Sequence, residues 1–165
     1  MGAGKSTIGQ RLAARLRLPF VDCDREIERA ANLSIPEIFE RFGESYFRDG
    51  ERRVIARLMG EAPAVIATGG GAFMNERTRS LILGSGYAIW LDADIDMLVE
   101  RTARRPGQRP LLVNGDPHAV LASLAAARNP TYALAHLHIR NQTTRHDTAV
   151  EMIVKALEEG QMGIR

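Results

Sequence analysis

The first seven residues, Met1–Thr7, have the residue types and spacing of a phosphate-binding loop. They match the second half of the pattern G-x-x-x-x-G-K-[ST]. Glycines there let consecutive backbone N–H groups turn toward an anion, because a Cβ atom would crowd that geometry. Lys5 is then expected to reach the β- and γ-phosphates, and the Ser6 hydroxyl is expected to bind Mg²⁺. A helix that follows at once would add the partial positive charge of its N-terminus.

This loop pattern is incomplete in the sequence. Its first glycine would fall before Met1, and the apolar strand that ordinarily leads into such a loop is absent. A chance glycine-rich start is the alternative interpretation. The helical spacing of Ile8, Leu12 and Leu16 directly after the loop favours phosphate binding.

Composition limits the class of protein. The chain has 165 residues, 45% hydrophobic and 25% charged, which fits one globular domain. A net charge of +2 and 5% aromatic residues argue against a nucleic-acid surface, and no apolar run is long enough to cross a bilayer. The single cysteine, Cys23, is expected to be a small packing residue in a reducing compartment. The sequence therefore predicts a cytoplasmic protein that binds neither nucleic acid nor membranes.

Short apolar segments alternate with segments of helical periodicity. Strands are expected at 18–21, 64–67, 87–91 and 137–139, and helices at 6–16, 25–32, 34–43, 44–59, 76–83, 94–102, 117–128 and 148–159. The helix at 117–128 is expected to stop before Asn129-Pro130. This alternation predicts an α/β fold with a parallel sheet and helices on both faces.

Asp22 and Asp24 follow the first expected strand. Positions two apart on an extended backbone face the same way, and the carboxyl ends of parallel strands line the ligand crevice. One carboxylate could bind the Mg²⁺ shell, and the other could accept a substrate hydroxyl and take its proton. The alternative is an Asx turn that caps the next helix.

Three glycines and three arginines are further candidates. Gly69–Gly71 would let a ligand approach the backbone closely, although a plain strand-to-helix turn is the alternative. Arg48, Arg109 and Arg128 could grip carboxylate or phosphate groups through paired donors. The residue pattern alone does not distinguish them from the other basic residues.

The ordered set of motifs resembles the shikimate kinase family over nearly the whole chain. The resemblance implies a three-layer P-loop kinase fold of the nucleoside-monophosphate-kinase type, with strand order 2-3-1-4-5 and the first, central strand missing from this chain. It implies transfer of the γ-phosphoryl group of ATP to the 3-hydroxyl of shikimate, with Mg²⁺, in chorismate and aromatic amino-acid biosynthesis. The motifs are G-A-G-K-S-T at 2–7, D-C-D at 22–24, Y-F-R at 46–48, G-G-G at 69–71, R-P-L-L at 109–112 and R-N-P-T-Y at 128–132.

The resemblance also implies roles for single residues. The implied catalytic residues are Lys5, Asp24 and Arg109, and the implied metal ligands are Ser6 and Asp22. The implied ATP contacts are Gly2, Ala3, Gly4, Lys5, Ser6, Thr7, Arg101, Arg109 and Arg145. The implied shikimate contacts are Asp24, Arg48, Gly70, Gly71 and Arg128.

The expected organisation is one monomeric domain over residues 1–165. It has a shikimate-binding helical region at about 25–60 and a lid loop at about 103–116. Loss of the central strand is expected to expose strand edges and to leave the chain poorly stable or poorly active. Two alternatives remain: a kinase of the same fold for another small polyol such as gluconate, and a non-catalytic nucleotide-binding remnant.

Overall fold

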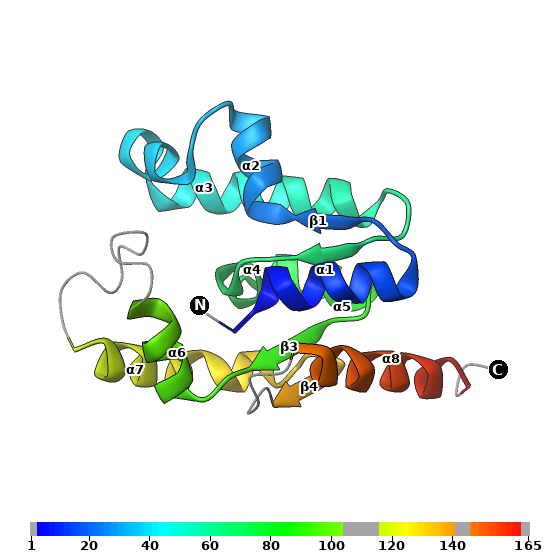
Figure 1. The fold of residues 1–165 in the computed structure, drawn as a ribbon. Helices are drawn as coiled ribbons and strands as arrows, with labels where there is room; N and C mark the ends of the chain where they lie inside the picture. Colours follow the sequence, from blue (N-terminus) through cyan, green and yellow to red (C-terminus); the bar gives the residue numbers. More distant parts are fainter. Residues whose placement is uncertain (1–2, 104–115, 141–145, 163–165) are drawn as a thin grey trace. The chain divides into compact units, whose positions relative to one another are not determined.

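The computed structural model describes residues 3–103, 116–140 and 146–162, and the chain divides into two compact units (Figure 1). Unit 1 comprises Met1–Lys5 and Ala88–Arg165, and unit 2 comprises Ser6–Tyr87. Each unit contains one pair of parallel strands joined through helices. That both units act together as one domain stays a prediction.

Unit 2 contains two strands and five helices, of which only the first residue of the first helix, Lys5, is assigned to unit 1. β1 and β2 pair in parallel, with Val21 opposite Ile66. The strands are short, and the helices between them supply most of the core. The elements are α1 (Lys5–Leu16), β1 (Phe20–Asp22), α2 (Cys23–Ala31), α3 (Ile35–Met59), β2 (Val65–Ala67), α4 (Gly70–Met74) and α5 (Glu76–Ser85).

Helix α3 packs across α2 and contributes most of the buried core cluster of unit 2 (Figure 1). A capping box starts it: the Ser34 side chain accepts from the Glu37 N–H, and the Glu37 carboxylate accepts from the Ser34 N–H. The backbone leaves helical geometry at Gly43, with φ 78° and ψ 177°. The two helices expected at 34–43 and 44–59 are therefore one element with a kink at the expected boundary.

Unit 1 pairs the other two strands in parallel, with Trp90 opposite His138. Helix α8 packs on β4, where Ile139 and Ile153 are both buried. The Trp90 and His138 rings stack with centroids 3.9 Å apart. The elements are β3 (Ile89–Asp92), α6 (Ile95–Ala103), α7 (Pro117–Tyr132), β4 (Leu137–Arg140) and α8 (His146–Met162).

The expected end of helix α7 is wrong. The helix continues through Pro130 to Tyr132, and the Ala133 N–H donates to the Asn129 carbonyl. A proline in the last turn removes a single backbone hydrogen bond, so the turn can close after it. The sequence-based prediction therefore gave Asn129-Pro130 too much weight as a helix-ending signal.

The strands form two two-stranded sheets, β1–β2 and β3–β4. If β1 is counted as strand 2 of the expected order 2-3-1-4-5, these are the pairs 2-3 and 4-5. Among the described residues, no strand takes the place of strand 1. The prediction of a parallel α/β fold is confirmed.

Candidate active site

The phosphate-loop residues that the structure describes lead directly into α1. Gly4 has φ 85°, a left-handed conformation that favours glycine, and α1 begins at Lys5, one residue earlier than expected. Ser6 and Thr7 are exposed in the first turn of α1. Gly2 lies outside the described residues. A glycine in the left-handed region before a helix N-terminus fits the predicted anion-binding loop.

Asp22 joins the loop to helix α2. Its Oδ2 accepts a hydrogen bond from the Ser6 hydroxyl (3.3 Å), and its Oδ1 accepts one from the backbone N–H of Asp24 (3.1 Å). Asp22 is both the last residue of β1 and the N-cap of α2. The expected extended geometry of Asp22 and Asp24 is wrong, because the helix begins at Cys23. The capping alternative is correct for Asp22, which still faces Ser6.

Ser6 and Asp22 suit a magnesium ion by their chemistry. A hydroxyl and a carboxylate oxygen are hard donors, and they already meet within hydrogen-bond distance. Mg²⁺ in phosphoryl-transfer sites commonly uses only one or two carboxylates and takes the rest of its shell from phosphates and waters. Within the described part of the chain, no cluster of three or more His, Cys, Asp or Glu side chains could form an all-protein site. Ser6 and Asp22 therefore fit a magnesium site whose remaining ligands are phosphate and water oxygens.

Two carboxylates converge on the start of the triple glycine. A Cβ atom placed on Gly69 would lie 3.5 Å from Glu51 Oε1 and 3.7 Å from Asp24 Oδ1. Asp24 lies in the first turn of α2, and Glu51 comes from the middle of α3. The sequence analysis did not single out Glu51. The available signal was its place three residues after Arg48, on one face of a helix.

Arg48 is held from several sides. Its Nη1 donates to Glu51 Oε2 (2.8 Å), while Nε and Nη2 both donate to Glu44 Oε1 (3.2 Å each). Its guanidinium carbon lies 5.1 Å from the centroid of the Phe47 ring, within cation–π range. Of the five guanidinium N–H groups, these contacts use three. With the acceptors in the described part of the chain counted, one N–H on each of Nη1 and Nη2 remains for an anionic ligand.

Gly71 lies against this guanidinium. A Cβ atom at Gly71 would come within 2.7 Å of both the guanidinium carbon and Nη2 of Arg48, and it would contact Nη1 as well. Real Cβ atoms are not found at such distances, so Arg48 can take this position only because residue 71 has no side chain. Glycine at position 71 is therefore required by the position of the Arg48 guanidinium, and not only by the turn between strand and helix.

The electrostatics of the cluster follow from burial. Desolvation raises the pKa of the Glu51 carboxyl, and the nearby Asp24 and Glu44 charges add to this, while the hydrogen bond from Arg48 opposes it. Burial by itself lowers the pKa of Arg48, but its bonds to Glu51 and Glu44 outweigh that and raise it. Burial and four nearby carboxylates raise the pKa of the Cys23 thiol to about 12. Cys23 is therefore a neutral packing residue at neutral pH.

The other predicted site residues lie in unit 1 or outside the described residues. Arg128 is half-buried in α7, and Arg101 belongs to α6. Arg109 and Arg145 fall outside the described residues. The structure thus brings together Ser6 with Asp22, and Asp24 with Arg48 and the glycines. The sharing of one substrate by Arg48 and Arg128 stays a prediction.

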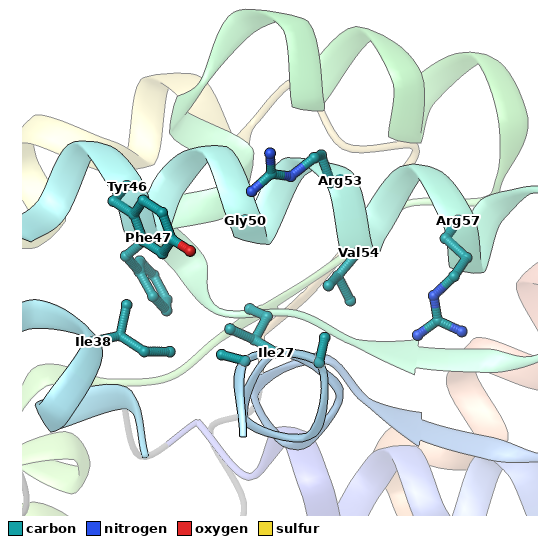
Figure 2. A pocket seen from close by; sticks show the side chains of 10 residues that line it. Ile27, Ile38, Tyr46, Phe47, Gly50, Arg53, Val54 and Arg57 are labelled. Carbon is teal, nitrogen blue, oxygen red and sulfur yellow. The ribbon is translucent and has the colours of Figure 1, made fainter. Parts of the chain in front are cut away.

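A pocket of about 320 Å³ lies between α2 and α3, but it is not lined by Asp24 or Arg48 (Figure 2). Ile27, Phe47 and Val54 line it together with Arg53 and Arg57. The Arg57 guanidinium is already paired with Glu26 (2.7 Å) and Glu61 (2.8 Å), and Arg53 with Asp49 (3.5 Å). The pocket is therefore distinct from the cluster of Asp24, Arg48 and Gly71, although Phe47 belongs to both.

Comparison with known proteins gives one consistent family for this chain. The family model described as "Shikimate kinase" matches residues 1–158. The chain belongs to the shikimate kinase family. It is 54% identical over 157 residues to the shikimate kinase of Bradyrhizobium diazoefficiens, covering 95% of this chain and 75% of that protein. It is 51% identical over 163 residues to that of Novosphingobium aromaticivorans, covering 96% of this chain and 84% of that protein.

Solved shikimate kinases have the same fold. Shikimate kinase from Acinetobacter baumannii in complex with shikimate aligns with a TM-score of 0.90 at 35% identity, over 97% of this chain and 89% of that one. The enzyme from Aquifex aeolicus aligns with a TM-score of 0.82 at 32% identity, over 99% and 94% of the two chains. Members of this family are ATP-dependent phosphotransferases, which fits the predicted phosphate loop.

None of the helices described here has the length and apolar character needed to cross a bilayer.

Proposed function

We propose that this shikimate kinase family member transfers the γ-phosphoryl group of ATP to the 3-hydroxyl of shikimate, giving shikimate 3-phosphate and ADP. The observation that carries the proposal is the meeting of Asp24 and Arg48 at the triple glycine. A molecule with one carboxylate and three hydroxyls suits a site with a guanidinium for the carboxylate and a hydrogen-bond acceptor for a hydroxyl, and this cluster offers both. The shikimate complex of the Acinetobacter baumannii relative supports the choice of substrate.

In this proposal Arg48 binds the substrate carboxylate through its remaining Nη1 and Nη2 donors. Asp24 accepts the hydrogen bond of the reacting hydroxyl and takes its proton as the new oxygen–phosphorus bond forms. The bond between the γ-phosphorus and the bridging oxygen breaks, and ADP leaves with that oxygen. Little covalent help is required, because such transfers depend mainly on alignment and charge neutralisation. Gly70 and Gly71 supply backbone beside the substrate, and Arg128 is the second carboxylate ligand.

We assign the nucleotide side to the phosphate loop and the metal pair. Ser6 and Asp22 would hold Mg²⁺, which neutralises charge on the phosphates when it is bound. Lys5 neutralises the β- and γ-phosphates from the start of α1. The remaining assigned ATP contacts are Gly2, Ala3, Gly4, Thr7, Arg101, Arg109 and Arg145, with Arg109 in the lid. The proposal is of a cytoplasmic monomer that contacts neither nucleic acid nor membranes.

A coupled ADP-release assay tests this function. With ATP and Mg²⁺, we expect shikimate to start ADP release and gluconate to leave it at background. Gluconate-dependent release without a shikimate response would identify the polyol-kinase alternative. ATP binding with no ADP release from either alcohol would identify the non-catalytic remnant.

The close contact between Gly71 and Arg48 gives a further prediction. Gly71→Ala places a methyl group where the guanidinium lies, so the guanidinium must move and weaken its bond to Glu51. We expect the KM for shikimate to rise about tenfold, the size of one lost hydrogen bond to a charged group, with the KM for ATP unchanged. Steady-state kinetics with each substrate varied would measure this.

Gly84→Ala is the matched control, because Gly84 also lies in a helix and has no neighbour near the added Cβ atom. Both substitutions improve helix propensity by roughly 0.5–1 kcal/mol, so neither is expected to unfold the protein. A KM for shikimate that is the same in the two variants would contradict the role given to Gly71.

A further inference from the structure

We infer that Arg79 is a positioning residue for the substrate side of the site. Its guanidinium holds the C-terminal end of helix α4, and it thereby fixes the backbone of Gly70 and Gly71 at the other end of that helix. The inference rests on the proposed function, in which these two glycines lie beside the substrate. It adds a residue that does not itself contact the substrate.

Helix α4 is too short to be stable by itself. It has five residues, Gly70–Met74, and isolated helices shorter than about 12 residues are marginal in water. Two of the five are glycines, which favour a helix less than any other residue except proline. The N-cap residue, Gly69, has no side chain that could accept from the first N–H groups of the helix. Contacts from other elements must therefore keep α4 in place.

Arg79 contacts the end of α4 from the neighbouring helix α5. Its Nη1 donates to the Phe73 carbonyl (3.1 Å) and to the Met74 carbonyl (3.3 Å), and both contacts are partly buried. The last four carbonyls of a helix have no partner within it, and a positive charge at this end interacts favourably with the helix dipole. The two N–H groups of Nη1 can serve one carbonyl each, so a single nitrogen closes the end of the helix.

Helix α5 holds Arg79 in a fixed place. Asn75, which lies between the two helices, caps α5 by accepting from the backbone N–H (3.1 Å) and the hydroxyl (3.3 Å) of Thr78, and Thr78 is buried. Two apolar residues further along α5 pack against the core cluster to which α3 contributes, namely Leu81 and Ile82. The backbone that carries the Arg79 side chain is therefore anchored to the core formed with α3.

The contact at Gly71 makes the position of α4 important for the substrate. A Cβ atom at Gly71 would come within 2.7 Å of the Arg48 guanidinium carbon, so no free space separates the helix from the guanidinium. Without Arg79, the Phe73 and Met74 carbonyls would lose these donors, and the last turn of α4 would fray. Because α4 is little more than one turn long, the fraying would reach its glycines.

The experiment compares Arg79→Met with Arg77→Met by steady-state kinetics. Methionine keeps an unbranched apolar side chain and removes the guanidinium, and Arg77 is an exposed arginine on the same helix. We expect Arg79→Met to raise the KM for shikimate about fivefold, the fold-change of one ordinary hydrogen bond. Its kcat and KM for ATP, and all three constants of Arg77→Met, should stay within about twofold of the parent, as for surface substitutions.

Arg79→Lys tests the kind of contact. Both hydrogen bonds come from one nitrogen, and an ammonium group carries three donors, so lysine can take over this contact. We expect the KM for shikimate of Arg79→Lys to lie closer to that of the parent than to that of Arg79→Met. A lysine variant as impaired as the methionine variant would contradict the contact with the α4 carbonyls.

Hydrogen exchange reports on α4 without turnover. The Ala72 N–H donates to the Gly69 carbonyl (3.1 Å) at the start of this helix, and Arg79→Met should speed up exchange there, whereas Arg77→Met should not. Ser34→Ala is the stability control, because it removes the capping box of α3 and should lower the melting temperature. It should leave the KM for shikimate and the exchange at Ala72 unchanged.

The outcomes are distinguishable. An unchanged KM for shikimate in Arg79→Met, or the same rise in Ser34→Ala, would overturn the positioning role and leave the proposed function in place. Absence of shikimate-dependent ADP release in the parent protein would overturn the proposed function, and this inference with it. If Arg79→Met melts too low for kinetics, Arg79→Gln takes its place under the same criteria, because its amide ends well short of the guanidinium position.

Discussion

Asp24→Asn is expected to lower kcat by a factor of about 10²–10⁴, the usual contribution of a general base. Asparagine keeps the size of the side chain but cannot take the proton of the reacting hydroxyl. The KM for ATP should stay close to the parent value, because none of the assigned ATP contacts lies at the start of α2. Single-turnover measurement of ADP formation with saturating shikimate would give the rate.

The fold should tolerate this change. Asp24 lies in the first turn of α2, where a negative charge adds only about 0.3–1 kcal/mol to helix stability. Asp49→Asn is the matched control, because Asp49 is an exposed aspartate paired with Arg52 on α3. Retention of most of the activity by Asp24→Asn would remove Asp24 as the base. A loss of similar size in Asp49→Asn would show that the effect does not depend on the site.

Arg48→Ala is expected to raise the KM for shikimate by a factor of about 10–150, with a smaller effect on kcat. A hydrogen bond to a charged group contributes roughly 1.5–3 kcal/mol, and the fold-change follows from that energy. The variant also leaves Glu51 buried without its cationic partner, which should lower the melting temperature. Initial rates over a range of shikimate concentrations would give both constants.

Arg48→Lys keeps the prediction testable if the alanine variant folds poorly. Lysine keeps a positive charge beside Glu51 but loses the planar fork, so the KM should rise while the melting temperature stays near that of the parent. Arg52→Ala is the control, because the Arg52 guanidinium pairs with Asp49 in solvent. If Arg48→Lys and Arg52→Ala both show a parent-like KM, the fork is not used to bind the substrate.

Much of the site was predictable from the sequence because its parts are continuous motifs. The loop at Ala3–Thr7, the pair Asp22 and Asp24, and the triple glycine each carry a local signal in residue type and spacing. The geometry of the aspartates was not predictable in the same way. An extended strand end and a helix cap use the same residues, and only the observed start of α2 at Cys23 decides between them.

The case of Glu51 shows that residue spacing along a helix does not by itself identify a site residue. Acidic and basic residues three or four apart are frequent in this arginine-rich chain, as in the pairs Arg29 with Glu26 and Arg52 with Asp49. What sets Glu51 apart is burial, and burial depends on how α2, α4 and the glycine turn pack on α3. Helix α7 continues through Pro130 for a local reason, because a proline in the last turn removes only one backbone hydrogen bond.

The dual role of Asp22 has a mechanical consequence. One oxygen of its carboxylate contacts the nucleotide side at Ser6, and the other holds the peptide group that carries the acceptor side at Asp24. In the proposed function, the nucleotide-binding residue Ser6 and the substrate-binding residue Asp24 are therefore linked through the single carboxylate of Asp22. A movement of one of them is expected to shift the other. If the proposed roles hold, metal binding at Asp22 is expected to change the position of the Asp24 backbone through this one carboxylate.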